Sequence, residues 1–194
     1  MKGLLVVISA PSGAGKSTLC ECLLRRRKNL AVSVSVTTRL PRRGEKDGKD
    51  YFFVSEAAFK AMRRRGELLE WAAVHGHFYG TPRRFVERRR SEGKDVLLNI
   101  DVQGGLQVKR HSRDAVLIFI QTPHFSDLEA RLRRRSLDSE TEIRRRLANA
   151  RRELRCASAY DYQVVNDQIP NACRQLEAIL TAESLRVNNL RRNS

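Results

Sequence analysis

The apolar run "LLVVI" (residues 4–8) leads directly into the glycine-rich stretch "SAPSGAGKST" (residues 9–18). Gly13 and Gly15 let the backbone curl so that several N–H groups face one anion. The helix predicted over residues 17–27 directs the positive end of its dipole at the same point. A buried strand, a glycine-rich loop and a helix in this order constrain the fold strongly, because they are typical of α/β proteins that bind nucleotide phosphates.

This phosphate-binding loop follows the pattern GxxxxGK[ST] with one departure. Gly15, Lys16 and Ser17 are in register, whereas Ala10 stands at the position of the leading glycine. Lys16 can reach β and γ phosphate oxygens, and the Ser17 hydroxyl can hold Mg²⁺. We therefore predict that the loop binds the triphosphate of ATP, with Mg²⁺ as the cofactor. The predicted ATP-binding residues of the loop are Ala10, Pro11, Ser12, Gly13, Ala14, Gly15, Lys16, Ser17 and Thr18.

Three further apolar runs resemble the first in length and continuity. They cover residues 96–100, 115–120 and 162–165, and they alternate with helix-like stretches over residues 103–110, 125–135 and 172–190. Continuous apolarity indicates strands that are buried on both faces, as in a parallel sheet. The order predicts an α/β fold with a doubly wound parallel sheet flanked by helices.

Two segments interrupt this alternation. Residues 33–91 contain the alternating "VSVSVTTR", the turn-rich "LPRRGEKDGKDYFFV" with a second strand, and "EWAAVHGHFYG", which we interpret as a third strand. Residues 126–155 have a helical, arginine-rich composition. A chain of 194 residues fits one domain with such appendages.

The net charge of +16 favours polyanionic partners. Only 6% of the residues are aromatic, so the interleaved aromatic side chains of a nucleic-acid groove are not expected, and we interpret the arginine clusters as solvated helix faces. The four cysteines have no metal-ligand spacing and predict reduced thiols. No signal peptide and no run of 18 apolar residues is visible, so we expect a soluble cytoplasmic protein without a membrane partner.

The segment "SVTTRLPRRGEKDGKDYFFV" (residues 35–54) carries a second set of anion-binding side chains. Arg39 and Arg42 lie on either side of Pro41, and hydroxyl groups lie nearby in the sequence. Such a set can bind a doubly charged phosphate through charge-assisted hydrogen bonds. From composition alone, an exposed basic hairpin explains the segment equally well.

Several ordered motifs together resemble the guanylate kinases over residues 4–183. They are "SAPSGAGKST", "TTRLPRRGEKDGKDYFFV", "LLEWAAVHGHFYGTP", "NIDVQG", "RRRLANARREL" and "YDYQVVND". The resemblance implies a P-loop NTPase-type core (about residues 1–32, 92–125 and 156–194), a small mixed α/β GMP-binding insert (about 33–91) and a helical lid (about 126–155). It also implies transfer of the γ-phosphoryl group of ATP to GMP, with dGMP as a further candidate acceptor.

The resemblance implies roles for side chains on the acceptor side. Glu70 would accept hydrogen bonds from guanine N1–H and N2–H, which adenine does not offer as a pair, and Thr81 would donate to guanine O6. Asp101 would meet the guanine amino group or order waters around Mg²⁺, whereas Asn99 occupies a position that is usually acidic in the family. A helix cap is the alternative reading of Asp101. The residues implied to hold the GMP phosphate are Ser35, Arg39, Arg42, Tyr51 and Tyr79.

On the donor side, the resemblance implies that Arg131, Arg135 and Arg146 of the lid approach ATP and stabilise charge on the transferred phosphoryl group. Asn166 would lie near the edge of the adenine ring, with a turn-forming role as the alternative. The predicted catalytic residues are Lys16, Arg39, Arg135 and Arg146, and the predicted metal contacts are Ser17 and, through water, Asp101.

Three other functions remain open from the sequence. A catalytically inactive module of the same fold could bind a phosphopeptide in the acceptor site, although such a module has no need of Lys16 and Ser17. A kinase for another nucleoside monophosphate would lack the pair Glu70 and Thr81. A nucleic-acid-binding protein is favoured only by the net charge. We expect a monomer or a small homo-oligomer.

Overall fold

The computed structural model describes residues 2–74, 76–135 and 139–187. At its centre lies a five-stranded sheet in the order β2-β7-β1-β8-β9, in which all neighbouring strands are parallel. The strands are β1 (Leu5–Ser9), β2 (Leu30–Val32), β7 (Asp95–Asn99), β8 (Val116–Gln121) and β9 (Tyr162–Val165). The predicted parallel sheet flanked by helices is confirmed, and β2 is a strand that the search for apolar runs missed because it spans only three residues.

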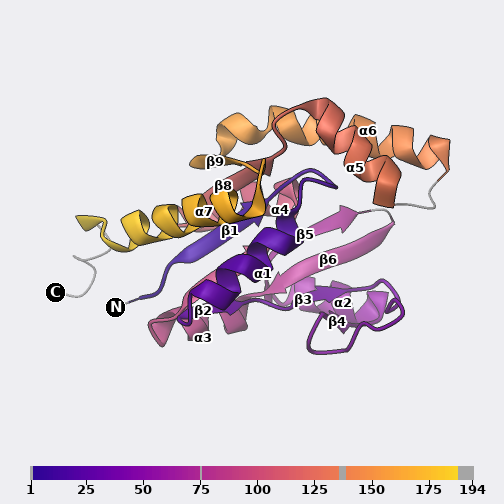
Figure 1. Ribbon diagram of the computed structural model, residues 1–194. Helices are drawn as coiled ribbons and strands as arrows, with labels where there is room; N and C mark the ends of the chain where they lie inside the picture. The colour runs from indigo at the N-terminus through magenta and orange to yellow at the C-terminus, as the bar shows by residue number, and fades with distance from the viewer. Residues whose placement is uncertain (1, 75, 136–138, 188–194) are drawn as a thin grey trace.

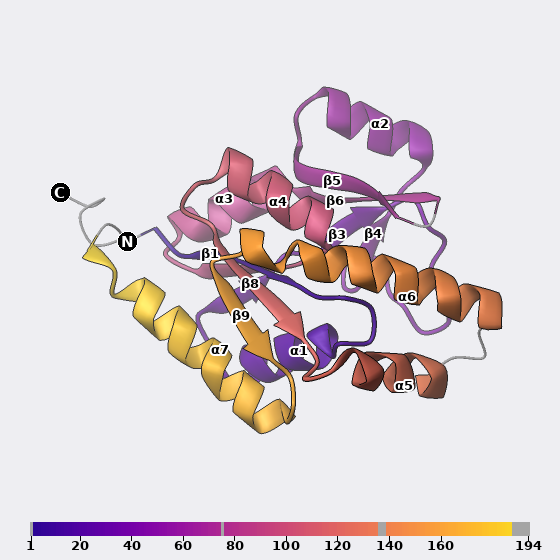
Figure 2. The ribbon, with the colours of Figure 1, turned by 90° about the horizontal axis from the view of Figure 1, so that it is seen from above.

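Helices cover both faces of this sheet (Figures 1 and 2). Val6 and Ile8 of β1 belong to the hydrophobic core shared with α1 (Lys16–Arg26) and α7 (Ile169–Ser184). Leu5 and Val7 belong to the core shared with α3 (Arg83–Ser91) and α4 (Val102–His111). Successive side chains of a strand point to opposite faces, so the unbroken apolar run of β1 serves two cores.

A second, four-stranded sheet in the order β4-β3-β6-β5 lies beside the first. It consists of β3 (Ser35–Thr37), β4 (Tyr51–Phe53), β5 (Leu68–Val74) and β6 (His77–Pro82), and α2 (Glu56–Arg64) follows β4. The prediction of one strand over "EWAAVHGHFYG" is wrong, because the segment belongs to the antiparallel pair β5 and β6. Gly76, with φ of 81°, lies where the chain reverses between them.

Two helices, α5 (Phe125–Arg135) and α6 (Glu140–Arg155), follow β8 and run side by side at one end of the molecule (Figure 2). Ser139 caps α6 by accepting a hydrogen bond from the Glu142 N–H. A 3-10 turn, η1 (Ala157–Ala159), connects α6 to β9. The division of the chain into core, insert and lid at the residue numbers given above stays a prediction.

The C-terminal helix and the cysteines differ from expectation. Helix α7 ends at Ser184 instead of residue 190, and residues 188–190 lie outside the described part of the chain. A disulfide joins Cys22 of α1 to Cys173 of α7, with a Cα–Cα distance of 6.4 Å, so the prediction of reduced thiols is wrong for this pair. In the described part of the chain, no helix combines the length and the apolarity needed to cross a membrane.

Candidate functional site

The glycine-rich loop joins β1 to α1 and holds a conformation that its sequence allows. Gly13 and Gly15 have φ of 90° and 89°, in the left-handed region that favours glycine. A Cβ atom at Gly15 would overlap the side-chain amide of Asn166, so the position also lacks room for a side chain. Helix α1 begins at Lys16, immediately after the loop, and its N-terminus therefore faces the concave side of the loop.

Lys16 connects the loop to the end of a neighbouring strand. Its Nζ donates a 2.8 Å hydrogen bond to the carbonyl oxygen of Ile100, just after β7. Burial lowers the pKa of this ammonium group, because an apolar environment disfavours its charge. Lys16 thus follows the loop in the sequence, while its ammonium group lies at the end of β7.

Between the two sheets lies the acceptor cavity, of about 150 Å³. Six of the predicted site residues contribute to its lining. They are Lys16, Ser35, Tyr51, Glu70, Tyr79 and Asp101, and Asn99 lies among them. Arg39 donates from Nε to the Tyr79 hydroxyl at 3.2 Å, so it belongs to the same cluster. Arg42 is exposed on the loop between β3 and β4 and does not line this cavity.

Glu70 is a carboxylate at the buried end of the acceptor cavity. Its side chain accepts a 2.6 Å hydrogen bond from the Thr81 hydroxyl, and the two residues are 5% and 0% exposed. Burial raises the pKa of Glu70 to about 7. Because Thr81 uses its one proton on Glu70, the prediction that it donates to guanine O6 does not hold in this arrangement. Thr81 instead orients the carboxylate.

Two residues of α4 support Glu70, and the sequence analysis assigned a role to neither. A Cβ atom at Gly104 would lie 2.5 Å from Oε2 of Glu70, so only glycine leaves room for the carboxylate. Gln107 exchanges two hydrogen bonds with the backbone of Trp71, at 3.3 and 2.7 Å. The glycine pair in "DVQGG", directly after a buried strand, was the signal available for Gly104.

Asp101 follows β7 and has the structural role that was its alternative reading. Its Oδ1 accepts a 2.8 Å hydrogen bond from the Gly104 N–H and so caps α4. Asp101 also lines both the acceptor cavity and a second cavity under the lid. Asp101 therefore caps α4 and also borders both cavities.

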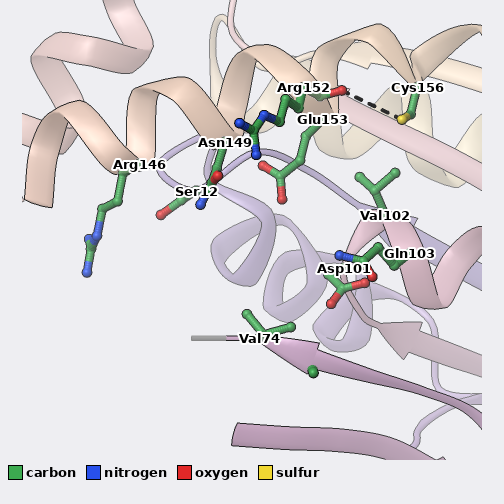
Figure 3. Close-up of a pocket in the computed structure, with 11 residues that line it drawn as sticks. Ser12, Val74, Asp101, Val102, Gln103, Arg146, Asn149, Arg152, Glu153 and Cys156 are labelled. Atoms are coloured by element: carbon green, nitrogen blue, oxygen red, sulfur yellow. Dashed lines mark hydrogen bonds between the residues drawn. The ribbon is translucent and has the colours of Figure 1, made fainter. Parts of the chain in front are cut away.

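This second cavity, of about 300 Å³, lies between α6 and the sheet ends (Figure 3). Arg146, Asn149 and Glu153 line it from one face of α6, whereas Ser12 and Asp101 line it from the core. Figure 3 shows the Glu153 carboxylate directed toward Asp101 and Arg146 farther along the helix. Burial raises the pKa of Glu153 to about 7. Arg146, Asn149 and Glu153 are three and four residues apart, so they share one face of α6. The sequence analysis selected only Arg146 of these three.

A third cavity lies on the other side of the loop. Gly13, Gly15 and Thr18 line it together with Arg131 and Asn166. The Asn166 Nδ2 donates to the Ala14 carbonyl at 2.7 Å, and Arg131 Nη2 donates to the Asn166 carbonyl at 3.2 Å. Asn166 thus contacts the loop directly, and Arg131 contacts Asn166.

The predicted lid arginines are not together in this structure. Arg131 lines the third cavity and Arg146 the second. Arg134, which we had interpreted as a solvated residue, also lines the third cavity. Arg135 is the last residue of α5, and its side chain lies outside the described residues.

The sequence and the fold of this chain are similar to those of known proteins. The model of the family "Guanylate kinase" matches residues 2–183. The chain belongs to the guanylate kinase family. It is 48% identical to the guanylate kinase of Caldanaerobacter subterraneus subsp. tengcongensis over 187 residues, which cover 96% of this chain and 91% of the relative. It is 46% identical to that of Thermotoga maritima over 187 residues, covering 96% and 90%.

The crystal structure of the guanylate kinase from Anaplasma phagocytophilum matches this fold with a TM-score of 0.77 and 37% identity, over 95% of this chain and 88% of that chain. This family membership confirms the resemblance on which the predicted fold was based. A shikimate kinase from Bacteroides thetaiotaomicron matches with a TM-score of 0.50 and 16% identity, over 92% and 98% of the two chains, and shares the fold alone.

Proposed function

We propose that this guanylate kinase family member transfers the γ-phosphoryl group of ATP to GMP, giving ADP and GDP. The position of Lys16 is the observation that carries the proposal. Its ammonium group belongs to the glycine-rich loop by sequence and also lines the acceptor cavity with Glu70 and Tyr79. One positive charge therefore lies where a donor triphosphate and an acceptor phosphate would meet, which suits direct in-line transfer without a covalent enzyme intermediate.

On the acceptor side, the chain supplies opposite charges at the two ends of one cavity. Arg39, Tyr51, Tyr79 and Ser35 bind the phosphate of GMP, with Arg42 approaching from its exposed loop. Glu70, oriented by Thr81, accepts hydrogen bonds from the guanine N1–H and N2–H groups. Adenine offers no such pair of donors, so the buried carboxylate would keep only its contact with Thr81. Hydrogen bonds left unmade at a buried charged group cost enough to reject the wrong base by several orders of magnitude.

On the donor side, the loop and α1 bind the triphosphate, and Asn166 approaches the adenine edge. Lys16 neutralises charge between the β and γ phosphates, and Arg131, Arg135 and Arg146 of the lid add positive charge around the transferred group. Arg131 and Arg146 line two different cavities. We therefore infer that the lid closes during the reaction and excludes the water that would otherwise accept the phosphoryl group.

The side chains fit Mg²⁺ as the accompanying cofactor. In the described residues, no group of three or more His, Cys, Asp or Glu side chains is arranged as a metal site. This suits an ion that is held mainly by nucleotide phosphates and water, with the Ser17 hydroxyl as a protein ligand and Asp101 ordering a water. Bound Mg²⁺ supplies charge neutralisation at the phosphate oxygens.

We place this reaction in the cytoplasm. We also propose dGMP as a further acceptor.

A panel of acceptors tests the proposal. GMP, dGMP, AMP, UMP, CMP and dTMP are each incubated with Mg·ATP, and diphosphate formation is measured for the wild type and for Lys16→Ala. We expect turnover with GMP that falls strongly in the variant. A folded wild-type protein that binds GMP but forms no diphosphate with any acceptor would show instead a binding module, and phosphopeptides would then be the ligands to test.

A further inference from the structure

Glu45 has no role in the site as described so far, although its carboxylate accepts three hydrogen bonds in the loop between β3 and β4. Its Oε2 and Oε1 accept hydrogen bonds of 2.8 and 2.9 Å from Nη1 and Nη2 of Arg39. Oε2 also accepts a 2.7 Å hydrogen bond from the backbone N–H of Arg42. The side chains of Arg39 and Glu45 are 11% and 21% exposed, so this ion pair is largely withdrawn from water.

The remaining contacts of Arg39 define which part of its guanidinium is available to a ligand. Nη1 donates its second hydrogen to the Leu40 carbonyl at 2.8 Å, and Nε donates to the Tyr79 hydroxyl at 3.2 Å. A guanidinium carries five N–H groups in a fixed plane. Four have these partners, and among the described residues none accepts from the fifth, the second N–H of Nη2.

This fifth N–H points in the same direction as the Nε–H. In a planar guanidinium, Nη1 and Nη2 form the end edge, which Glu45 occupies, while Nε and Nη2 form the side edge. The side edge faces Tyr79, which lines the acceptor cavity with Tyr51. Glu45 therefore occupies one edge of Arg39 and leaves free one N–H of the other edge, which lies next to Tyr79, a residue that lines the acceptor cavity.

We propose that Glu45 is a positioning residue for the acceptor phosphate: it holds the end edge of Arg39 so that the side edge, next to Tyr79, is presented to the phosphate of GMP. The inference rests on the proposed function, because it assumes that the cavity binds GMP. The rings of Tyr51 and Phe53 lie 5.2 and 5.8 Å from the Arg39 guanidinium carbon and restrict it from a further side.

Two features favour positioning over competition between Glu45 and the phosphate. The carboxylate is tied to the backbone of its own loop through the Arg42 N–H, so it cannot leave Arg39 without remodelling the loop. The Arg39 guanidinium and the Arg42 N–H hold the pKa of Glu45 at about 2, so it remains charged throughout the neutral range. An arginine that is already oriented loses less conformational entropy when the phosphate binds.

The test compares Glu45→Gln with Glu67→Gln. Glu67 offers a matched control, because it pairs with Arg65 through two contacts of 2.6 and 3.1 Å, but on the exposed surface. Each substitution removes one negative charge next to an arginine of the same sheet region. Steady-state kinetics would give KM for GMP, KM for ATP and kcat, and guanosine would serve as a competitive inhibitor that occupies the base site without a phosphate.

We expect Glu45→Gln to raise KM for GMP roughly tenfold to a hundredfold, the range for a lost hydrogen bond to a charged group. The inhibition constant of guanosine and the KM for ATP should change less than about twofold, and Glu45→Asp should restore part of the affinity. Glu67→Gln should match the wild type. In an Arg39→Ala background, Glu45→Gln should have no further effect, because Glu45 acts through Arg39.

Three outcomes would overturn the inference. A lower KM for GMP in Glu45→Gln would mean that Glu45 competes with the phosphate. An equal loss of guanosine and GMP affinity, or additive effects of the Glu45 and Arg39 substitutions, would mean a general structural role for the loop. A wild type that turns over GMP while Glu45→Gln matches Glu67→Gln would refute the positioning role alone, whereas a wild type without GMP turnover would refute the proposed function.

Discussion

The acceptor cavity and the lid differ in how their charged side chains are held. In the acceptor cavity, Glu70 accepts a hydrogen bond from Thr81 of the neighbouring strand β6, and Arg39 is fixed by Glu45 of its own loop and by Tyr79 of β6. On the lid, Arg146 forms an ion pair of 3.5 Å with Glu142 of its own helix. Arg131 of α5 does have a partner outside its helix, the Asn166 carbonyl, so the contrast applies to Arg146. From it we predict that the acceptor side is organised before substrate arrives, and that Arg146 reaches its working position only when the proposed lid moves.

The largest expected effect concerns the lid. Arg146→Ala should lower kcat by roughly a hundredfold to a thousandfold, because a positive charge that acts on the transition state is lost. The KM for GMP should remain within about twofold of the wild type, since the acceptor cavity does not include Arg146. Arg144→Ala is the control, because Arg144 lies two residues away on α6 with a side chain that is 79% exposed. A large rise in KM for GMP with unchanged kcat would remove the contrast.

A second prediction concerns the pH dependence of stability through Glu70. Because burial raises its pKa to about 7, the folded state binds more protons than the unfolded state between about pH 4.5 and 7, and stability falls as pH rises through this window. Glu70→Gln should therefore be more stable than the wild type at pH 8, by roughly 3 kcal/mol at most, and equal to it near pH 4. Urea unfolding at both pH values measures this.

Glu153 has a similarly raised pKa and contributes a slope of the same sign, so part of the wild-type pH dependence should persist in Glu70→Gln. An unchanged slope and an unchanged stability at pH 8 would show that Glu70 is not desolvated as the structure indicates. The desolvated carboxylate proposed for base recognition would then be absent from the acceptor cavity.

A third, smaller effect tests how closely the acceptor cavity is packed. Gly104→Ala should raise KM for GMP about tenfold, because the added Cβ atom would displace the Glu70 carboxylate, and overpacking of this kind costs about 1 to 3 kcal/mol. The KM for ATP provides the internal control, since the loop and α1 are not adjacent to this Cβ position. Equal changes in both KM values would point to a general disturbance of α4.

The smallest expected effect concerns an exposed ion-pair cluster on α5 and α6. Arg133 pairs with Glu129 and Glu140 at 3.0 and 2.7 Å, but its side chain is 44% exposed. Exposed ion pairs contribute little to stability because water screens them, so Arg133→Gln should leave the free energy of unfolding nearly unchanged and should change kcat by less than twofold. A large loss of kcat would mean that the surface arginines of the lid also take part in the reaction.

Sequence reasoning succeeded where a residue's role depends on its neighbours in the chain. The loop, its glycines and Lys16 form a local motif, and the unbroken apolar runs identified four of the five strands of the core sheet. It failed for β2, which is too short to show a pattern, and for the hairpin of β5 and β6, where "EWAAVHGHFYG" was interpreted as one strand although "HGH" around Gly76 interrupts its apolar residues. Hydrophobic periodicity cannot distinguish one long strand from two strands joined by a tight turn.

Contacts between distant segments were beyond the reach of such patterns. The pairing of Cys22 with Cys173 depends on the packing of α1 against α7, and the two cysteines are 151 residues apart. Gly104 lies against Glu70 only because α4 packs on β5. Glu45 was passed over because, in the sequence, it is one of three acidic residues scattered through a basic loop.

Short runs of residues were enough to identify the class of fold, the glycine-rich loop and the family, because the spacing within each run follows from helix and strand geometry. The packing of the chain decided that Thr81 donates to Glu70, that Asp101 caps α4, and that Arg131 and Arg146 line separate cavities. The physical reason is the short range of hydrogen bonds and steric contacts. These interactions act over a few ångströms, and which groups come that close is decided by the packing of helices on sheets.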